Sequence, residues 1–422
     1  MWVLRNLVWS FVERIFPRGA SALVMVLLAA MATPSVVGIY ALGILSLSLF
    51  QSVTDASIRQ IAVRAVKSQS GRRFLSKYKN AVLSSGTVFL LACFFGIYLY
   101  LPSSLESHTW ALMPLLAVPF ISVLRVESVA RLQLVNSWKS LARIQVVAAA
   151  VSLLVSIPLL LMTRSLWASS VQMLLTELIF TFLAVRHAHG LSPLEPGTSD
   201  GTAIAREYGQ VSMYSALGWA QGQADRLFLT LFAGPAALGL YTFAQSLSRS
   251  VGDSLSTSTS NVLRPKLLVE KLSASEIRGR TEPLLIRAGF MSGISTIVVI
   301  LATVLLFPLF LSDEWGPALN AAAIMSLAVG PTMLSWSITV VLIAMGRMRW
   351  AAPIKVLGVG MALPIALVAV ADLEAAAFLV VGRDVLIMVL MLLVARSAIG
   401  WRTTFWFLLW LGALGALVGF IR

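Results

Sequence analysis

Long apolar runs separated by short polar segments follow one another along nearly the whole chain. A run of about 20 apolar residues is long enough to cross a bilayer as a helix. The pattern therefore predicts an all-α polytopic membrane protein. The expected spans are 17–33, 36–57, 80–101, 109–125, 143–163 and 166–185 in the first half, 208–232, 237–262, 284–311, 318–345, 351–371 and 375–395 in the second, and a shorter run at 403–421.

Basic residues concentrate in every second connection between these spans. The basic connections are Arg5 to Arg18, Arg59 to Lys79, Arg125 to Arg143, Arg186 to Arg206, Arg264 to Arg287, Arg347 to Lys355, and Arg396 with Arg402. The alternate connections, 33–36, 102–109, 164–166, 233–237, 312–317 and 372–374, hold one base, Arg164. Because basic loops stay on the cytoplasmic side, the pattern predicts a cytoplasmic N-terminus.

The two halves share a motif. Pro34-Ser-Val-Val-Gly-Ile-Tyr40 corresponds to Gly234-Pro-Ala-Ala-Leu-Gly-Leu-Tyr241, and an aspartate follows each copy, Asp55 and Asp253. Both copies fall on the outer side, between the first and second spans of their halves, which predicts parallel repeats. The expected organisation is an N-terminal six-helix bundle (1–190), a cytoplasmic linker (191–206), a C-terminal six-helix bundle (207–396) and an additional C-terminal helix (397–422).

Composition supports a membrane protein and excludes other classes. The chain has 422 residues, of which 58% are hydrophobic and 12% charged, and its mean hydropathy is +0.88. The net charge of +14 is explained by basic cytoplasmic loops, so no nucleic-acid partner is expected. Phosphate-binding loops, metal-ligand clusters and catalytic triads are missing from the sequence, which predicts neither an enzyme nor a cofactor. The apolar run after Ala20 is expected to be a retained helix and not a cleaved signal peptide.

Ionisable residues inside apolar spans are the candidate functional residues. Burying a charge in hydrocarbon is costly, so such side chains should face a bundle interior or a wet cavity. Arg249 and Asp253 lie four residues apart and are expected to pair on one helical face. Adjacent residues diverge by about 100° around a helix, so the pairs Asp225-Arg226 and Arg383-Asp384 are expected to find partners on other helices.

Two interpretations of these charges stay open. Arg226, Arg249 and Arg383 either line a cationic cavity that binds a phosphate, for which the planar guanidinium is suited, or clamp helices together. The acids are candidates for ion coupling or helix pairing: Asp55, Glu177, Asp225, Asp253 and Asp384. Glu177 has no local partner in the sequence. Trp219 and Trp336 lie within spans and either stack on sugar rings or pack in the core.

Several motifs resemble those of a known family. The segments are 225–244, Leu263-Arg-Pro265, Val37-Gly-Ile-Tyr40 to Arg59, and Lys355-Val-Leu-Gly-Val-Gly360. They are similar to Wzx-type oligosaccharide flippases of the MOP superfamily, relatives of MATE exporters and lipid II flippases. The run at 403–421 departs from the family's twelve spans.

The resemblance implies a fold and a function. It implies two six-helix bundles around a central cavity, and translocation of a polyprenyl-diphosphate-linked oligosaccharide by alternating access. The setting would be the bacterial inner membrane, for export of exopolysaccharide or the O-antigen of lipopolysaccharide. Membrane lipids and, additionally, a polysaccharide polymerase and assembly proteins would be the partners. The alternative is a MATE-like ion-coupled exporter of small molecules, which an arginine-lined cavity suits poorly when the cargo is cationic.

Overall fold

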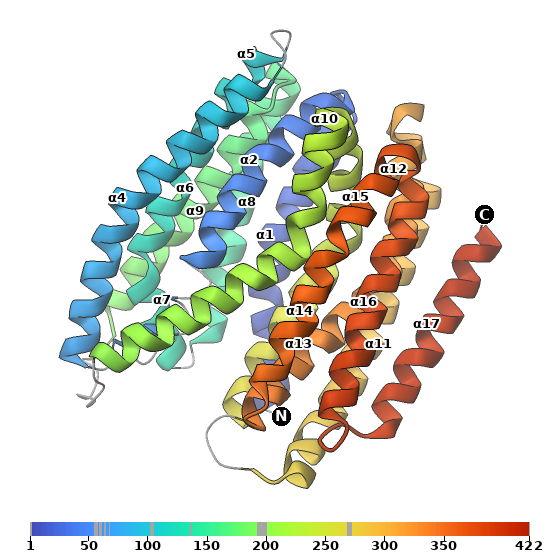
Figure 1. The fold of residues 1–422 in the computed structure, drawn as a ribbon. Coiled ribbons are helices and arrows are strands. Elements are labelled where there is room, and N and C mark those ends of the chain that lie inside the picture. Colours follow the sequence, from blue (N-terminus) through green and yellow to red (C-terminus); the bar gives the residue numbers. More distant parts are fainter. Residues whose placement is uncertain are drawn as a thin grey trace. The chain divides into compact units, whose positions relative to one another are not determined.

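The described part of the chain is built from helices alone (Figure 1). A computed structural model describes residues 2–54, 58, 61–62, 65–66, 68–101, 105–135, 137–191, 201–267 and 272–421. Within these ranges there is no strand, so the predicted all-α class is confirmed. Asp55 and residues 192–200 of the predicted linker lie outside the described residues.

The helices follow the apolar runs. The first half contains α1 (Trp2–Ala29), α2 (Pro34–Val53), α4 (Gln69–Tyr100), α5 (Glu106–Thr109), η1 (Trp110–Leu112), α6 (Met113–Leu124), α7 (Val126–Leu134), α8 (Trp138–Thr163) and α9 (Trp167–His189). The second half contains α10 (Gly201–Leu267), α11 (Ala274–Leu301), the π-helical η2 (Ala302–Leu306), η3 (Phe307–Leu309), η4 (Asp313–Trp315), α12 (Gly316–Met325), η5 (Ser326–Ala328), α13 (Val329–Ala344), η6 (Met348–Trp350), α14 (Ala351–Gly360), α15 (Ala362–Ala371), α16 (Leu373–Ala395) and α17 (Trp401–Ile421).

Many of these helices are suited to a bilayer. Among the described residues, nine helical segments are long and apolar enough to cross a membrane, and a tenth is the pair Trp110–Leu124 and Val126–Leu134, bent by 45°. The chain is therefore a multi-pass membrane protein. The bend falls at Arg125, where the sequence predicts the end of a span.

Helix α10 contains two of the predicted spans. Gly234 interrupts its helical backbone with φ 77° and ψ −172°, a conformation that only glycine adopts without steric cost. Pro235 then begins the second arm, as is common at the first position of a helix. We call residues 201–233 the first arm and residues 235–267 the second arm. The break at Gly234 thus separates the spans predicted at 208–232 and 237–262.

The chain divides into two compact units. The C-terminal unit comprises Met1–Ala22, Thr33–Ser35 and Gln221–Arg422, and the N-terminal unit comprises Leu23–Ala32 and Val36–Ala220. Helices α1 and α10 therefore contribute residues to both units. The six-helix boundaries and the linker derived from the sequence stay a prediction.

Small and hydroxyl-bearing residues pack the helices of the N-terminal unit. Helix α8 lies along α9, and α6 packs on α9 as well. Ser152 on α8 and Thr176 on α9 are both buried, and their hydroxyls lie 2.8 Å apart. Small residues let helix backbones approach closely, which replaces the hydrophobic drive that is weak between helices in lipid.

The start of α4 makes another close contact, between Gly71 and the backbone of Ala65, which can be tested by substitution. A Cβ atom added to Gly71 would lie 2.2 Å from the carbonyl oxygen of Ala65, whereas one added to Gly96, on the same helix, meets nothing within 4 Å. Gly71→Ala is expected to lower the apparent melting temperature in detergent, because a backbone clash costs about 1–3 kcal/mol. Gly96→Ala is expected to be neutral or stabilising by up to about 1 kcal/mol. Equal melting of the two variants would contradict this packing.

Candidate polar site in the C-terminal unit

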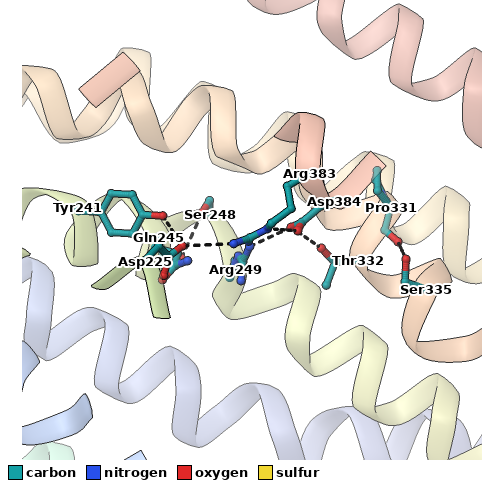
Figure 2. Close-up of polar contacts among 10 residues, drawn as sticks. All are labelled: Asp225, Tyr241, Gln245, Ser248, Arg249, Pro331, Thr332, Ser335, Arg383 and Asp384. Atoms are coloured by element: carbon teal, nitrogen blue, oxygen red, sulfur yellow. Dashed lines mark hydrogen bonds and ion pairs between the residues drawn. The ribbon is translucent and has the colours of Figure 1, made fainter. Parts of the chain in front are cut away.

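A chain of polar contacts runs through the C-terminal unit (Figure 2). The Tyr241 hydroxyl on the second arm of α10 donates to Asp225 Oδ2 on the first arm at 2.5 Å. Arg383 Nη1 on α16 lies 3.5 Å from the same oxygen, and Arg383 Nε donates to Asp384 Oδ1 at 3.0 Å. The Arg383 guanidinium therefore bridges two carboxylates.

The chain continues from Asp384 to two further helices. Arg249 Nη2 on the second arm of α10 donates to Asp384 Oδ2 at 2.9 Å, and the Thr332 hydroxyl on α13 donates to the same oxygen at 3.1 Å. One carboxylate thus gathers donors from α10, α13 and α16 (Figure 2). Charge-assisted hydrogen bonds of this kind are stronger than neutral ones, especially away from water.

The predicted pairing of Arg249 with Asp253 is wrong, whereas Arg383 and Asp384 have the expected partners on another helix. Arg249 does not pair with Asp253 four residues along α10: it reaches Asp384 on α16, and Asp253 Oδ2 lies 3.9 Å from Arg18 Nη1 on α1. Asp384 is buried, whereas Asp253 is partly exposed to solvent, so Asp384 attracts Arg249 more strongly than Asp253 does. The adjacent residues Arg383 and Asp384 do bind each other, because the long arginine side chain can fold back. Both also have partners on other helices, as expected.

The three arginines have different surroundings. Arg383 is 1% exposed and bound to two carboxylates, which is the arrangement of a helix clamp. Arg226 is 9% exposed, its Nε has no hydrogen-bond partner, and only its backbone N–H contacts Asp225, at 2.9 Å. Within the described ranges, no hydrogen bond or ion pair satisfies the Arg226 guanidinium.

The cluster consequently carries an excess positive charge. Among the described residues, four arginines (Arg18, Arg226, Arg249 and Arg383) face three carboxylates (Asp225, Asp253 and Asp384), which leaves a formal charge of one. Asp225 attracts the Arg226 guanidinium and Arg249 repels it, so Arg226 lies within the electrostatic field of this cluster. A buried, unpaired cation is unfavourable unless a counter-charge arrives.

Further buried polar atoms near this cluster lack partners. Gln245 lies one turn before Arg249 on α10 and is buried, yet neither its amide nitrogen nor its amide oxygen is hydrogen-bonded. Arg249 Nε is unpaired in the same way. Buried polar groups normally have a protein, water or ligand partner. These atoms indicate a place where water or a polar ligand binds.

The open side of the second arm of α10 is polar. Six of residues 241–260 are not buried, and five of those six are polar or charged: Ser246, Arg249, Ser250, Asp253 and Thr257. Their spacing of three and four residues places them on one side of the helix. A side facing lipid would be apolar, so these residues are expected to face water or polar groups and not lipid. We call these residues the polar stripe.

The corresponding segment of the first half lacks these charges. Tyr40 and Tyr241 match in the repeated motif, and sixteen residues before each lie Val24 and Asp225. Eight residues after each lie Ser48 and Arg249. Ser48 accepts a hydrogen bond from the indole nitrogen of Trp219 at 2.9 Å. The matching positions are thus uncharged in the first half and charged in the second.

Glu177 has a partner that the sequence did not reveal. Its carboxylate accepts a hydrogen bond from Arg125 Nη1, and the Arg125 guanidinium also lies 4.7 Å from the centre of the Phe180 ring. Arg125 was grouped with a basic connection, but the bend between α6 and α7 turns it inward. Glu177 is therefore half of an ion pair in the N-terminal unit.

The sequence did not identify Tyr241 and Thr332 as site residues. The repeated motif around Tyr40 and Tyr241 was the signal that could have identified Tyr241.

Solved structures of similar fold are membrane transporters. The lipid II flippase MurJ in its inward closed conformation has a TM-score of 0.69 at 11% identity, over 98% of this chain and 97% of that one. A MATE structure in the straight conformation has 0.67 at 14%, over 96% of both chains. A MOP superfamily transporter from Pyrococcus furiosus, with a binding pocket described as reversed in polarity, has 0.65 at 14%, over 95% and 96%. At these identities the likeness concerns the fold.

The chain thus has the fold of these MATE, MurJ and MOP superfamily structures. The model of a family described as polysaccharide biosynthesis protein matches residues 3–268, more than half of the 422 residues. The chain belongs to that family. The resemblance inferred from its motifs is confirmed. No curated protein sequence matches the chain significantly.

Proposed function

We propose that this protein is a flippase that carries polyprenyl-diphosphate-linked oligosaccharides across the bacterial inner membrane by alternating access, with its N-terminus in the cytoplasm. Its product would supply exopolysaccharide or O-antigen export. The observation that carries the proposal is the uncompensated Arg226 beside Arg249, next to the polar stripe. Membership of a polysaccharide biosynthesis family supports the saccharide part of the substrate.

The charge balance favours an anionic cargo. A diphosphate would supply the counter-charge that Arg226 lacks, and guanidinium groups bind phosphate oxygens through paired hydrogen bonds. Arg383, which the sequence grouped with the other two, is proposed to serve as a structural clamp, because both of its sides are occupied by carboxylates. An exporter of organic cations would need an acidic surface, and the excess charge of this cluster has the opposite sign.

Transport by the purified protein tests the proposal. Proteoliposomes would contain a fluorescent polyprenyl diphosphate that carries a saccharide, and a membrane-impermeant quencher would report the fraction in the outer leaflet. We expect the protein to accelerate the exchange between leaflets at least tenfold over protein-free vesicles. Parallel vesicles with imposed sodium or proton gradients would identify the coupling ion. Export of a cationic dye without movement of the lipid would instead support the MATE-like alternative.

A further inference from the structure

Trp336 lies on the open side of α13. Its side chain is 49% exposed, although this helix packs against α11, α16 and α17. The incompletely buried residues at helical spacing are Thr332, Trp336, Thr339 and Ile343. Two of these four residues carry hydroxyls, so this side of α13 is mixed in polarity and unlike a lipid-facing surface.

A lysine from the next helix approaches the same ring. Lys355 Nζ on α14 lies 5.6 Å from the centre of the Trp336 ring, within the range of a cation–π contact. Gly358 lies one turn further along α14. A Cβ atom added to Gly358 would lie 2.8 Å from Ile387 Cδ1 on α16. This close approach of α14 and α16 helps to hold Lys355 beside the indole.

Trp336 lies close to the polar cluster along α13. Thr332 lies one turn earlier on α13, where it donates to the Asp384 carboxylate that also holds Arg249. Trp336 therefore lies about one helical turn, roughly 5 Å along the axis, from Thr332, which contacts the carboxylate that binds Arg249. It is also eight residues from the end of α13 at Ala344, about 12 Å of helix. Interfacial tryptophans lie near the ends of membrane helices, so Trp336 lies too far from the end of α13 for that role.

This juxtaposition suits the substrate of the proposed function. In a lipid-linked saccharide the first sugar is bonded directly to the diphosphate, so a sugar site must lie beside the phosphate site. The C–H face of a pyranose ring stacks on an aromatic face, and an ammonium group donates hydrogen bonds to ring hydroxyls or to a sugar carboxylate. We propose that Trp336 and Lys355 form a binding subsite for the sugar attached to the diphosphate; this inference rests on the proposed function.

The chain provides a matched control for the tryptophan. Trp350 in η6 is 52% exposed, and the Arg349 guanidinium lies 5.8 Å from its ring centre. It is thus another exposed tryptophan with a cationic neighbour, but it lies outside α13 and its open side. Substitution of Trp350 therefore removes the same chemical group without removing the proposed subsite.

Binding of two lipids to the purified protein tests the subsite. The probes are fluorescent polyprenyl diphosphate without a sugar and the same lipid with a saccharide. Trp336→Leu is expected to weaken binding of the glycosylated lipid about tenfold and to leave binding of the bare diphosphate unchanged. Trp336→Phe, which keeps an aromatic face, is expected to retain most of the affinity, and Trp350→Leu all of it. Melting temperatures of the variants establish that they fold.

The other outcomes are distinct. Equal weakening for both lipids would show that Trp336 supports the structure and would overturn the subsite. Unchanged binding of both lipids by Trp336→Leu would also overturn it, while the proposed function would stand. If the wild-type protein binds neither lipid, the proposed function fails, and the subsite fails with it.

Discussion

Arg383→Met is expected to cause the largest loss of stability among substitutions in the C-terminal unit. The Arg383 side chain is buried and neutralises Asp225 and Asp384 together. Without it, Asp384 keeps its ion pair with Arg249, but Asp225 has no ion pair left among the described residues. Removing one partner of a buried ion pair typically costs about 3–5 kcal/mol, because an uncompensated charge stays behind. The apparent melting temperature in detergent should fall by several degrees.

A second substitution separates charge balance from lost packing. Asp225→Asn combined with Arg383→Met leaves Asp384 paired with Arg249 and removes the unpaired aspartate, so the cluster returns to its original formal charge of one. Because buried ion pairs can often be replaced by uncharged groups at little cost, the double variant should recover most of the lost stability. Comparison with Asp225→Asn alone completes a double-mutant cycle. If Arg383→Met melts like the wild type, the clamp role is wrong.

Arg226→Gln, in contrast to Arg383→Met, is expected to reduce transport without reducing stability. The Arg226 guanidinium has no acceptor among the described residues, so removing its charge should leave the melting temperature unchanged or raise it. Transport of the lipid-linked saccharide should nevertheless fall at least tenfold, because one charge-assisted hydrogen bond contributes about 1.5–3 kcal/mol. Residues that bind a substrate are often retained although they lower the stability of the protein.

Two further variants make this result specific. Arg226→Lys keeps the charge but loses the planar pair of donors, so intermediate transport is expected. Arg278→Gln removes a surface arginine near the start of α11, whose Nε lies 4.0 Å from Glu282, and should leave transport unchanged. Wild-type transport by Arg226→Gln, at normal protein levels, would remove Arg226 from the substrate site. Loss of folding by Arg226→Gln would instead identify it as a clamp.

Some features of the fold followed from the sequence because they depend on local pattern. Apolar runs of sufficient length predicted the helices, and Gly234 with Pro235 marked the break inside α10. The repeated tyrosine motif identified two related halves. Periodicity also located the candidate charges, because an ionisable residue within a 20-residue apolar run is conspicuous whatever its partner is.

The partners of these charges were decided by the tertiary structure. Arg249 and Asp384 are 135 residues apart and Asp225 and Arg383 are 158 apart, and their pairing depends on how α10 and α16 pack. Sequence spacing favoured Arg249 with Asp253 because it records only neighbours on one helix. The bend at Arg125 likewise brought that residue to Glu177.

The sequence by itself determined that this is a multi-pass helical membrane protein with arginines and aspartates inside the apolar spans of its second half. Only the tertiary structure decided which arginine is neutralised and which is not. The physical reason is that a charge in a low-dielectric interior is governed by the groups within a few ångströms of it. Those groups come from α10, α13 and α16, which are distant in sequence. Arg383 is thereby saturated by two carboxylates, while Arg226 is left with its charge unmatched.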